Sequence, residues 1–422
     1  MTPAARLQMA IEILEGLGQT AQPADRFLKA WFRSRRFAGS KDRRAIAERV
    51  FSVQRRRAHF SHRLAQQTSR ALVIASLLEE GQDPAALFTG GYGPAPLTQE
   101  ERAAIATPSS PGPDWVQGEY PLWLEEELRR AFGPRLLEEM SALQQRAPVD
   151  LRVNSLKAKR PDVLAALNAE GFAAQPTPHS PWGIRIPPGE GSAALAKSPL
   201  FESGAFEFQD EAAQLASLLA CAGPGMRVLD LAAGAGGKSL ALAAVMNNEG
   251  SILAFDDKTD RLAPLAERAG RAGAACIRIA EKRGGPLWEN GKFDLVFLDA
   301  PCSGSGTWRR QPELRWRLTP ERLAELNRIQ DWLLDDAARH TGPGGRLIYA
   351  TCSLLRCENQ DRVAAYLIRE HDRGRTMADI LDDPYVINRC TPPELERLLD
   401  RPDVIHAIGD DMAEARSALP GS

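Results

Sequence analysis

The sequence lacks several features that define whole classes of protein. Its six cysteines include no C-x-x-C pair, which argues against a disulfide framework and against a zinc site. No apolar run approaches the roughly 18–20 residues that a membrane span needs. The first residues do not join a basic segment to an apolar one, so we expect no signal peptide. These absences predict a cytoplasmic protein that binds no metal and does not enter a membrane.

Net charge is also small, but it is unevenly distributed. The 422 residues carry a formal charge of −2, whereas residues 1–70 hold 15 Lys or Arg against 5 Asp or Glu, which leaves −12 on the rest. A basic segment on an acidic chain indicates nucleic acid or another anionic partner. A solvated, arginine-rich helical surface would explain the same distribution.

Residue patterns divide the chain into five segments. The first is expected to be helical, because its apolar residues recur at helical spacing, and its many arginines must line a surface. The second is rich in glycine and proline, the third alternates like a small α+β unit, the fourth alternates strand and helix, and the last is acidic. We therefore expect a helical domain at 1–100, a linker with connecting helices at 101–148, an RNA-binding adaptor at 149–204, a catalytic domain at 205–370 and a divergent segment at 371–422.

The fourth segment gives the clearest prediction of fold. Short apolar runs predict strands at 226–232, 251–256, 275–280, 293–299 and 345–351, with helices at 238–247, 259–272 and 319–340. Such β-α-β alternation predicts an α/β fold with a mostly parallel, Rossmann-like sheet that helices cover on both faces. Ligands of such sheets bind at the carboxyl ends of the strands.

A glycine-containing loop follows the first of these strands, in Asp230-Leu-Ala-Ala-Gly-Ala-Gly-Gly-Lys-Ser239. Its glycines allow a tight turn and a close approach by a ligand, although the spacing is neither that of a dinucleotide fingerprint nor that of a P-loop. Asp256 ends the second strand, where a carboxylate can accept hydrogen bonds from ribose hydroxyls. The loop and Asp256 together predict an adenosine-containing cofactor. Asp230 favours S-adenosylmethionine, whose amino-acid end is cationic and which has no pyrophosphate.

Two cysteines follow neighbouring strands of the predicted sheet. Asp299 and Cys302 come at the end of the fourth strand, and Cys352 comes at the end of the fifth. A lone cysteine is usually a small buried hydrophobe, but two at matching strand ends indicate chemistry. A thiolate that adds to carbon 6 of a pyrimidine makes carbon 5 nucleophilic enough to accept a methyl group. An acid near N3 and a base for the proton on carbon 5 complete the reaction.

These motifs resemble the Nop/Sun family of RNA (cytosine-5) methyltransferases, in particular the bacterial small-subunit rRNA branch. The matching segments are the loop at 230–239, Asp299-Ala-Pro-Cys-Ser-Gly-Ser-Gly306, Arg310-Gln-Pro-Glu-Leu-Arg-Trp316 and Tyr349-Ala-Thr-Cys-Ser353 with Glu358-Asn359. The resemblance implies that Cys352 is the nucleophile, that Cys302 assists product release and that Asp299 approaches the cytosine. It also implies S-adenosylmethionine contacts from Ala232, Ala233, Gly234, Ala235, Gly236, Gly237, Lys238, Asp256 and Asp299, to which we add Arg261 and Glu281. The basic first segment resembles the NusB-like helical RNA-binding domain of that branch.

The sequence departs from the family at three places. At the end of the third strand the family has an aspartate near the adenine, and the nearest candidate here is Glu281. The loop Ala232-Ala-Gly-Ala-Gly-Gly-Lys238 stands where the family has Cys-Ala-Ala-Pro-Gly-Gly-Lys. The closing Asp-Gly-Phe-Phe segment of the family is absent, and Tyr385–Ile387 and Val404–Ile408 are candidates for replacement strands.

Arginine and tryptophan are concentrated at 308–317, after the fourth strand. Arginines hold phosphates and tryptophans stack on unpaired bases, so this loop is a candidate RNA contact. The predicted RNA-binding residues are Arg309, Arg310, Arg315 and Trp316, with Arg55, Arg56 and Arg57 in the basic segment. The alternative is that Trp316 is a buried anchor and that the arginines pair with acids such as Glu313.

The leading hypothesis is a monomeric enzyme that methylates carbon 5 of a cytosine in ribosomal RNA through a cysteine-linked intermediate. Transfer RNA is the alternative substrate for the same chemistry. A small-molecule methyltransferase would need neither the two cysteines nor the arginine-tryptophan loop. A non-catalytic ribosome-assembly factor is the alternative outside enzymology.

Overall fold

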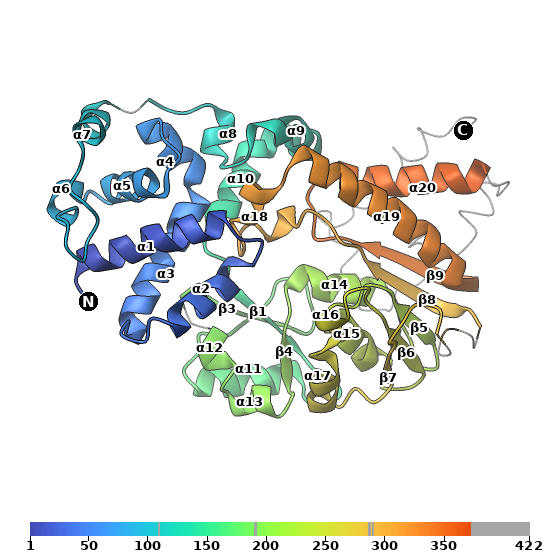
Figure 1. Ribbon diagram of the computed structural model, residues 1–422. Helices are drawn as coiled ribbons and strands as arrows, with labels where there is room; N and C mark the ends of the chain where they lie inside the picture. Colours follow the sequence, from blue (N-terminus) through green and yellow to red (C-terminus); the bar gives the residue numbers. More distant parts are fainter. Residues whose placement is uncertain (109, 190–191, 286–287, 289–290, 373–422) are drawn as a thin grey trace. The chain divides into compact units, whose positions relative to one another are not determined.

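The computed structural model describes residues 1–108, 110–189, 192–285, 288 and 291–372, and it divides into two compact units (Figure 1). The helical unit comprises residues 1–146, 303–322 and 352–356. The sheet unit comprises residues 147–302 and 323–351 and the described residues from 357 on. Two inserted segments thus fold with the helical unit, which a division into consecutive domains did not predict. The candidate strands at 385–387 and 404–408 lie outside the described residues.

The helical unit is built around one apolar core. Ile13, Ile46, Val50 and Ile74 are fully buried there, and Ile46 and Val50 are four residues apart, on one face of the same helix. The side chain of Thr2 caps the first helix by accepting from the amide of Ala5. The helices are α1 Pro3–Gly18, α2 Ala24–Arg33, α3 Ser40–Arg55, α4 Arg57–Leu64, α5 Ser69–Glu79, α6 Pro84–Leu87, α7 Gln99–Ala106, α8 Asp114–Gln117, η1 Leu122–Leu124, α9 Glu125–Phe132, η2 Gly133–Arg135 and α10 Leu136–Gln144, with η3 Ser305–Thr307 and α18 Leu314–Arg317 from the first inserted segment.

The sheet unit contains a small antiparallel sheet of order β2-β3-β1-β4. Its elements are β1 Val149–Val153, α11 Arg160–Ala169, β2 Gln175–Pro176, β3 Gly183–Ile186, α12 Ser192–Leu195, α13 Pro199–Glu202 and β4 Phe206–Phe208. β4 pairs with β1, with Arg152 opposite Glu207. The predicted start of the catalytic domain at 205 is therefore wrong, because the chain completes the small sheet before it enters the large one.

The large sheet has five parallel strands in the order β7-β6-β5-β8-β9. Its elements are α14 Glu211–Leu219, β5 Arg227–Asp230, α15 Gly237–Val245, β6 Ser251–Ala254, α16 Thr259–Leu262, α17 Leu265–Ala272, β7 Ile277–Ile279, β8 Phe293–Asp299, α19 Pro320–His340, β9 Thr341–Ala350, η4 Arg356–Glu358 and α20 Gln360–Asp372. The expected helix at 259–272 is divided in two near Pro264, a residue that has no N–H to donate within a helix.

Both faces of the large sheet are covered, as the continuous apolar runs predict. In β8, Leu295 and Phe297 pack with α15 and α17, while Val296 and Leu298 pack with α19 on the other face (Figure 1). The predicted fold class, a Rossmann-like sheet that follows a helical region and a small α+β unit, is confirmed. Within the described residues, no helix has both the length and the apolar composition of a membrane-spanning segment.

Candidate functional site

The loop between β5 and α15 is shaped by glycines in the left-handed region. Gly234 has φ 55° and Gly236, the N-cap of α15, has φ 78°. A Cβ at Gly236 would lie 2.1 Å from Cδ1 of Leu265, so only glycine fits there. The predicted residues Ala232, Ala233 and Ala235 lie in this loop, and Gly237 and Lys238 form the first turn of α15. The N-terminus of α15, where backbone N–H groups can meet an anionic or polar ligand, thus directly follows the glycine loop.

Asp230, at the end of β5, is fully buried beside this loop. Its Oδ2 accepts a 2.6 Å hydrogen bond from Oγ of Ser239, and Oδ1 has no hydrogen-bond partner in the described part of the chain. Burial raises the pKa of Asp230 to about 7, with smaller contributions from the charges of Asp299 and Asp256. A cationic ligand would satisfy Oδ1 and favour the ionised form. Ser239 was not among the predicted site residues, although it stands next to Lys238 in the motif.

Asp256 lies two residues beyond β6 and is almost completely buried. Its Oδ2 accepts from the amide of Gly234 at 3.0 Å, and its Oδ1 accepts from the amide of Lys258 at 2.9 Å. Arg261 lies 3.4 Å from the same Oδ2. The structure therefore brings Asp256, Arg261 and the glycine loop together. Glu281 is exposed, two residues beyond β7.

Asp299 is the last residue of β8 and forms an ion pair with Lys238. The distance from Nζ of Lys238 to Oδ2 of Asp299 is 2.5 Å, and the Asp299 side chain remains 36% exposed. Two predicted site residues from adjacent strand-end loops thus contact each other directly. The exposure leaves the Asp299 carboxylate accessible to a polar ligand atom.

Cys302 lies three residues beyond β8 and is partly buried. The carbonyl of the preceding Pro301 accepts a 3.0 Å hydrogen bond from Nε2 of Gln330 on α19. The same Nε2 donates to Oε1 of the buried Glu358, also at 3.0 Å. The backbone before Cys302 is therefore held from α19. Sequence reasoning missed Gln330, because one glutamine among the polar residues of a long helix gives no signal.

Cys352 lies two residues beyond β9, is exposed, and belongs to the helical unit. Its backbone carbonyl accepts a 2.9 Å hydrogen bond from the amide of Gly306. The following residue, Ser353, has its Oγ 3.3 Å from Oγ of Ser303 and 3.1 Å from Oγ of Ser305. The segments that follow the two candidate cysteines are thus hydrogen-bonded to each other.

The arginines predicted from the basic segment lie at the junction of α3 and α4, and all three are partly buried. Arg56 forms an ion pair with Glu79 at 2.5 Å, and the guanidinium carbon of Arg57 lies 6.0 Å from the ring centre of Trp316. Burial lowers the pKa of Arg55 and of Arg57, and the charge of Arg146 adds to the effect on Arg55. These residues therefore contribute to packing as well as to surface charge.

The arginine-tryptophan loop packs inside the helical unit. Arg315 is fully buried and donates a 2.7 Å hydrogen bond to the carbonyl of Glu119, which contradicts its predicted contact with RNA. Trp316 is partly buried and donates from Nε1 to the carbonyl of Gln54 at 3.0 Å. Arg309 donates to the carbonyl of Arg146, and Arg310 is exposed. The alternative interpretation of Trp316 as an anchor agrees with these contacts, although the hydrogen bonds go to carbonyls and not to acids.

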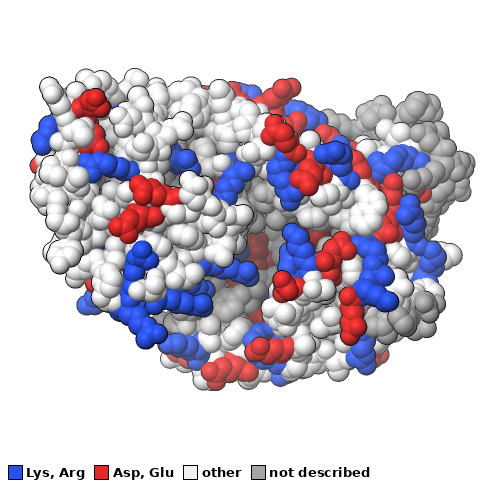
Figure 2. All heavy atoms as spheres, viewed as in Figure 1, with Lys and Arg blue, Asp and Glu red and all other residues white. Residues whose placement is uncertain are grey.

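Exposed cations gather instead at the corner between α2 and α3. Figure 2 shows Lys and Arg side chains concentrated over these two helices, at the lower left of the view. We define this α2–α3 patch as Lys29, Arg33, Arg36, Lys41 and Arg44, all exposed, with no carboxylate partner in the described ranges. Phe37 lies between these cations in the sequence and is 73% exposed. Such a patch combines charge for phosphates with an aromatic ring for a base.

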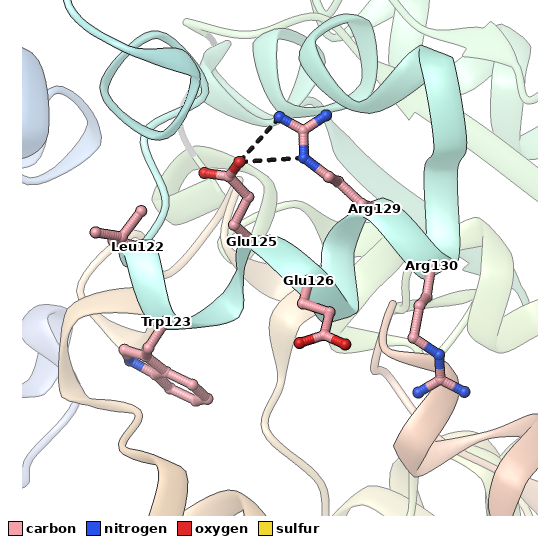
Figure 3. A pocket seen from close by; sticks show the side chains of 6 residues that line it. All are labelled: Leu122, Trp123, Glu125, Glu126, Arg129 and Arg130. Atoms are coloured by element: carbon pink, nitrogen blue, oxygen red, sulfur yellow. Dashed lines mark hydrogen bonds and ion pairs between the residues drawn. The ribbon is translucent and has the colours of Figure 1, made fainter.

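A pocket on η1 and α9 is a separate feature of the helical unit (Figure 3). Its lining residues are Leu122, Trp123, Glu125, Glu126, Arg129 and Arg130. Arg129 pairs with Glu125 at 2.9 Å, and Arg130 pairs with Glu127 at 2.6 Å. Because both arginines are already paired within α9, we do not propose that this pocket binds anions.

Comparison with known families supplies two matches. Residues 217–389 match the family described as 16S rRNA methyltransferase RsmB/F. Residues 120–189 match the ferredoxin-like domain of RsmF/B-like methyltransferases. The second match covers the elements from η1 to β3, and the first contains the glycine loop and both candidate cysteines.

Individual relatives agree with these matches. A Salmonella agona protein named ribosomal RNA small subunit methyltransferase B is 33% identical over 267 residues, or 63% of this chain and 61% of that protein. The chain thus matches about three fifths of that relative's length. The crystal structure of PH0851 covers 87% of this chain and 90% of its own at 26% identity, with a TM-score of 0.70. A methyltransferase homologue from Pyrococcus horikoshii covers 60% of this chain and 81% of its own at 28% identity, with a TM-score of 0.53.

Proposed function

We propose that the chain is a member of the RsmB/F family of 16S rRNA methyltransferases and that it methylates carbon 5 of a cytosine in ribosomal RNA. The methyl donor in this proposal is S-adenosylmethionine, and Cys352 is the nucleophile. The observation that carries the proposal is the placement of Asp299, Cys302 and Cys352 at the ends of the adjacent strands β8 and β9, in one sheet with the glycine loop.

The residues around the glycine loop fit S-adenosylmethionine. Oδ1 of the buried Asp230 has no hydrogen-bond partner in the described part of the chain, as expected of an acceptor kept for a ligand's ammonium group. Asp256 would hold the ribose hydroxyls, and Gly234 and Gly236 give the loop beside it the positive-φ turn that its backbone requires. When bound, S-adenosylmethionine would supply the methyl group. Arg261 and Glu281 remain proposed contacts.

The chain's own residues would carry out the remaining chemistry. The Cys352 thiolate would form a bond to carbon 6 of the cytosine, which moves electron density to carbon 5. Asp299, next to Lys238, would take up a proton and donate a hydrogen bond to N3, which stabilises the negative charge that develops on the ring as the thiolate adds. After carbon 5 is methylated, Cys302 would assist the loss of its proton. The electron pair released then expels the Cys352 thiolate and restores the double bond between carbons 5 and 6.

The substrate must present an unpaired or flipped cytosine to reach a thiolate. We propose that the α2–α3 patch docks the surrounding RNA, because its exposed cations have no carboxylate partners in the described ranges. Arg310, which is exposed, and the partly buried Arg309 remain proposed RNA contacts, whereas Trp316 is held by its hydrogen bond to Gln54. Arg315 is not among them, because its guanidinium is buried.

Methyl transfer to isolated ribosomal RNA tests the proposal directly. We would incubate the wild-type protein, Cys352→Ala and Cys302→Ala with labelled S-adenosylmethionine and small-subunit rRNA. Wild type should label carbon 5 of cytosine, and Cys352→Ala should lose this activity. Cys302→Ala should accumulate an RNA–protein adduct that survives denaturation, because the proton on carbon 5 is no longer removed.

Cys221→Ala is the matched control, since Cys221 follows α14, away from the strand ends that carry the chemistry. Full activity in Cys352→Ala would disprove its role as nucleophile. If only transfer RNA becomes labelled, transfer RNA is the substrate and the proposed chemistry still holds. RNA binding without any label would favour the ribosome-assembly factor.

A further inference from the structure

The segment 303–322 is attached to the rest of the helical unit by hydrogen bonds from several positions. The Glu313 carboxylate accepts from the amide of Ala24 at 2.9 Å and is almost completely buried. Arg317 donates to the carbonyls of Gln22 and Leu17, at 2.9 and 3.2 Å. The bonds from Arg315 and Trp316 described above belong to the same set. Together these contacts reach α1, the loop before α2, the end of α3 and Glu119.

The same segment holds the backbone around Cys352. Oγ of Ser305 accepts a 2.7 Å hydrogen bond from the amide of Leu354, and Oγ of Ser353 accepts a 3.0 Å bond from the amide of Leu355. The amide of Gly306 donates to the carbonyl of Cys352 itself. A Cβ on Gly306 would lie only 2.8 Å from that carbonyl oxygen, so the two backbones are as close as glycine allows. The backbone from Cys352 to Leu354 is therefore held by hydrogen bonds to 303–306.

We infer that the helical unit positions the candidate nucleophile. The loop 303–322 is hydrogen-bonded both to α1–α3 and to the backbone of Cys352, so it fixes that backbone relative to these helices. Glu313, Arg315, Trp316 and Arg317 are the positioning residues. The consequence for catalysis rests on the proposed function, whereas the positioning of the Cys352 backbone does not rest on it. It also gives the arginines and the tryptophan of this loop a role distinct from RNA binding. Loosening the loop should therefore affect turnover more than RNA affinity.

Trp316→Phe is the sharpest test, because it keeps an aromatic ring in place and removes the Nε1 donor to Gln54 together with part of the indole. Hydrogen–deuterium exchange of the free protein would be followed in peptides that cover 303–308 and 352–356. Loss of one such bond should speed exchange there about fivefold, while exchange of β5 stays unchanged. Arg317→Gln, which removes the bonds to Gln22 and Leu17, should act in the same direction. In steady-state methylation, kcat should fall and the KM for RNA should not rise.

Trp123→Phe and Arg102→Gln are the matched controls, since both residues lie in the helical unit outside this loop. Both should leave exchange at 352–356 unchanged. Unchanged exchange at 352–356 in Trp316→Phe and Arg317→Gln would overturn the inference, and a raised KM with unchanged exchange would assign the loop to RNA contact. A wild-type protein without methyltransferase activity would refute the proposed function and still leave the exchange result decisive for positioning.

Discussion

The Asp230 carboxyl is the clearest source of pH-dependent stability at the candidate cofactor site. Its pKa in the folded protein is raised to about 7 by burial, whereas an unfolded Asp titrates at about 3.9. Between these values the unfolded chain releases this proton and the folded chain keeps it, so the contribution of Asp230 to stability falls as pH rises. Above about pH 7 both forms are ionised and the penalty is constant. Asp230→Asn should remove this dependence.

Urea unfolding of wild type and Asp230→Asn between pH 4.5 and 8 measures the effect. The stability difference in favour of the variant should grow with pH and level off above about 7. Asp260→Asn, at an exposed position in α16, should show no such trend. A difference that is constant with pH would contradict the assignment. Asp230→Asn should also bind S-adenosylmethionine more weakly, since it lacks the anionic acceptor.

Residue types and spacing predicted which residues of the candidate cofactor site come together, but not what the arginines contact. The contact of Asp256 with Gly234 and the pair of Lys238 with Asp299 follow from strand ends that share one edge of a parallel sheet. Arg315 gave no such signal, because an arginine buried against a backbone carbonyl looks in sequence like one that meets phosphate. The exposure of the α2–α3 patch likewise depends on tertiary packing.

At the scale of elements, β4 is joined to α17 by a buried ionic cluster. Glu207 on β4 pairs with Arg268 at 3.0 Å and with Arg271 at 2.5 Å, and it lies opposite Arg152 in the sheet. Burial lowers the pKa of Arg152 to about 10, and the charge of Glu207 opposes that shift. Glu207→Ala would leave the Arg152 cation buried without its neighbouring carboxylate. We expect the free energy of unfolding to fall by about 3–5 kcal/mol.

Urea denaturation followed by circular dichroism gives this value. Glu267→Ala is the control, because Glu267 is an exposed residue of the same helix α17. The control should change the free energy of unfolding by no more than about 0.5 kcal/mol. A decrease in Glu207→Ala no larger than that of the control would show that the cluster contributes little net stability.

Long elements with a clear apolar pattern were predicted accurately, and short ones were not. The strand expected at 293–299 has those bounds in the structure, and the expected helix at 319–340 begins one residue later. β4 has three residues and pairs with β1, more than fifty positions earlier. No local pattern identifies so short a strand, because its stability comes from the partner. The assignment of 303–322 to the helical unit was missed for the same reason.

At the scale of the whole molecule, the proposed RNA affinity depends on unpaired surface charge. Changing Arg33, Arg36 and Arg44 to Gln removes three cations of the α2–α3 patch. Removing one cation from a phosphate should lower the slope of log affinity against log salt by about 0.7–0.9, so the triple variant should reduce the slope by roughly 2 to 3. Fluorescence anisotropy with an rRNA fragment over a range of salt concentrations measures this slope.

The triple change of Arg102, Arg328 and Arg339 to Gln is the control, since it alters net charge equally at exposed positions outside the patch. It should leave the slope nearly unchanged. Equal effects of the two triple variants would show that the patch attracts RNA only through net charge. Unchanged affinity in both would show that RNA docks elsewhere on the protein.

The chain passes between the helical and sheet units five times. Proteins whose domains are joined by one linker can be cut there, and each piece can fold alone. No single cut separates these two units, since the residues after β8 and β9 are part of the helical one. A fragment that begins at the small sheet would keep 303–322 and 352–356 but would lose the residues of 1–146 to which 303–322 is hydrogen-bonded. The two units are therefore expected to unfold in one cooperative calorimetric transition. Relatives are expected to contain both units or neither.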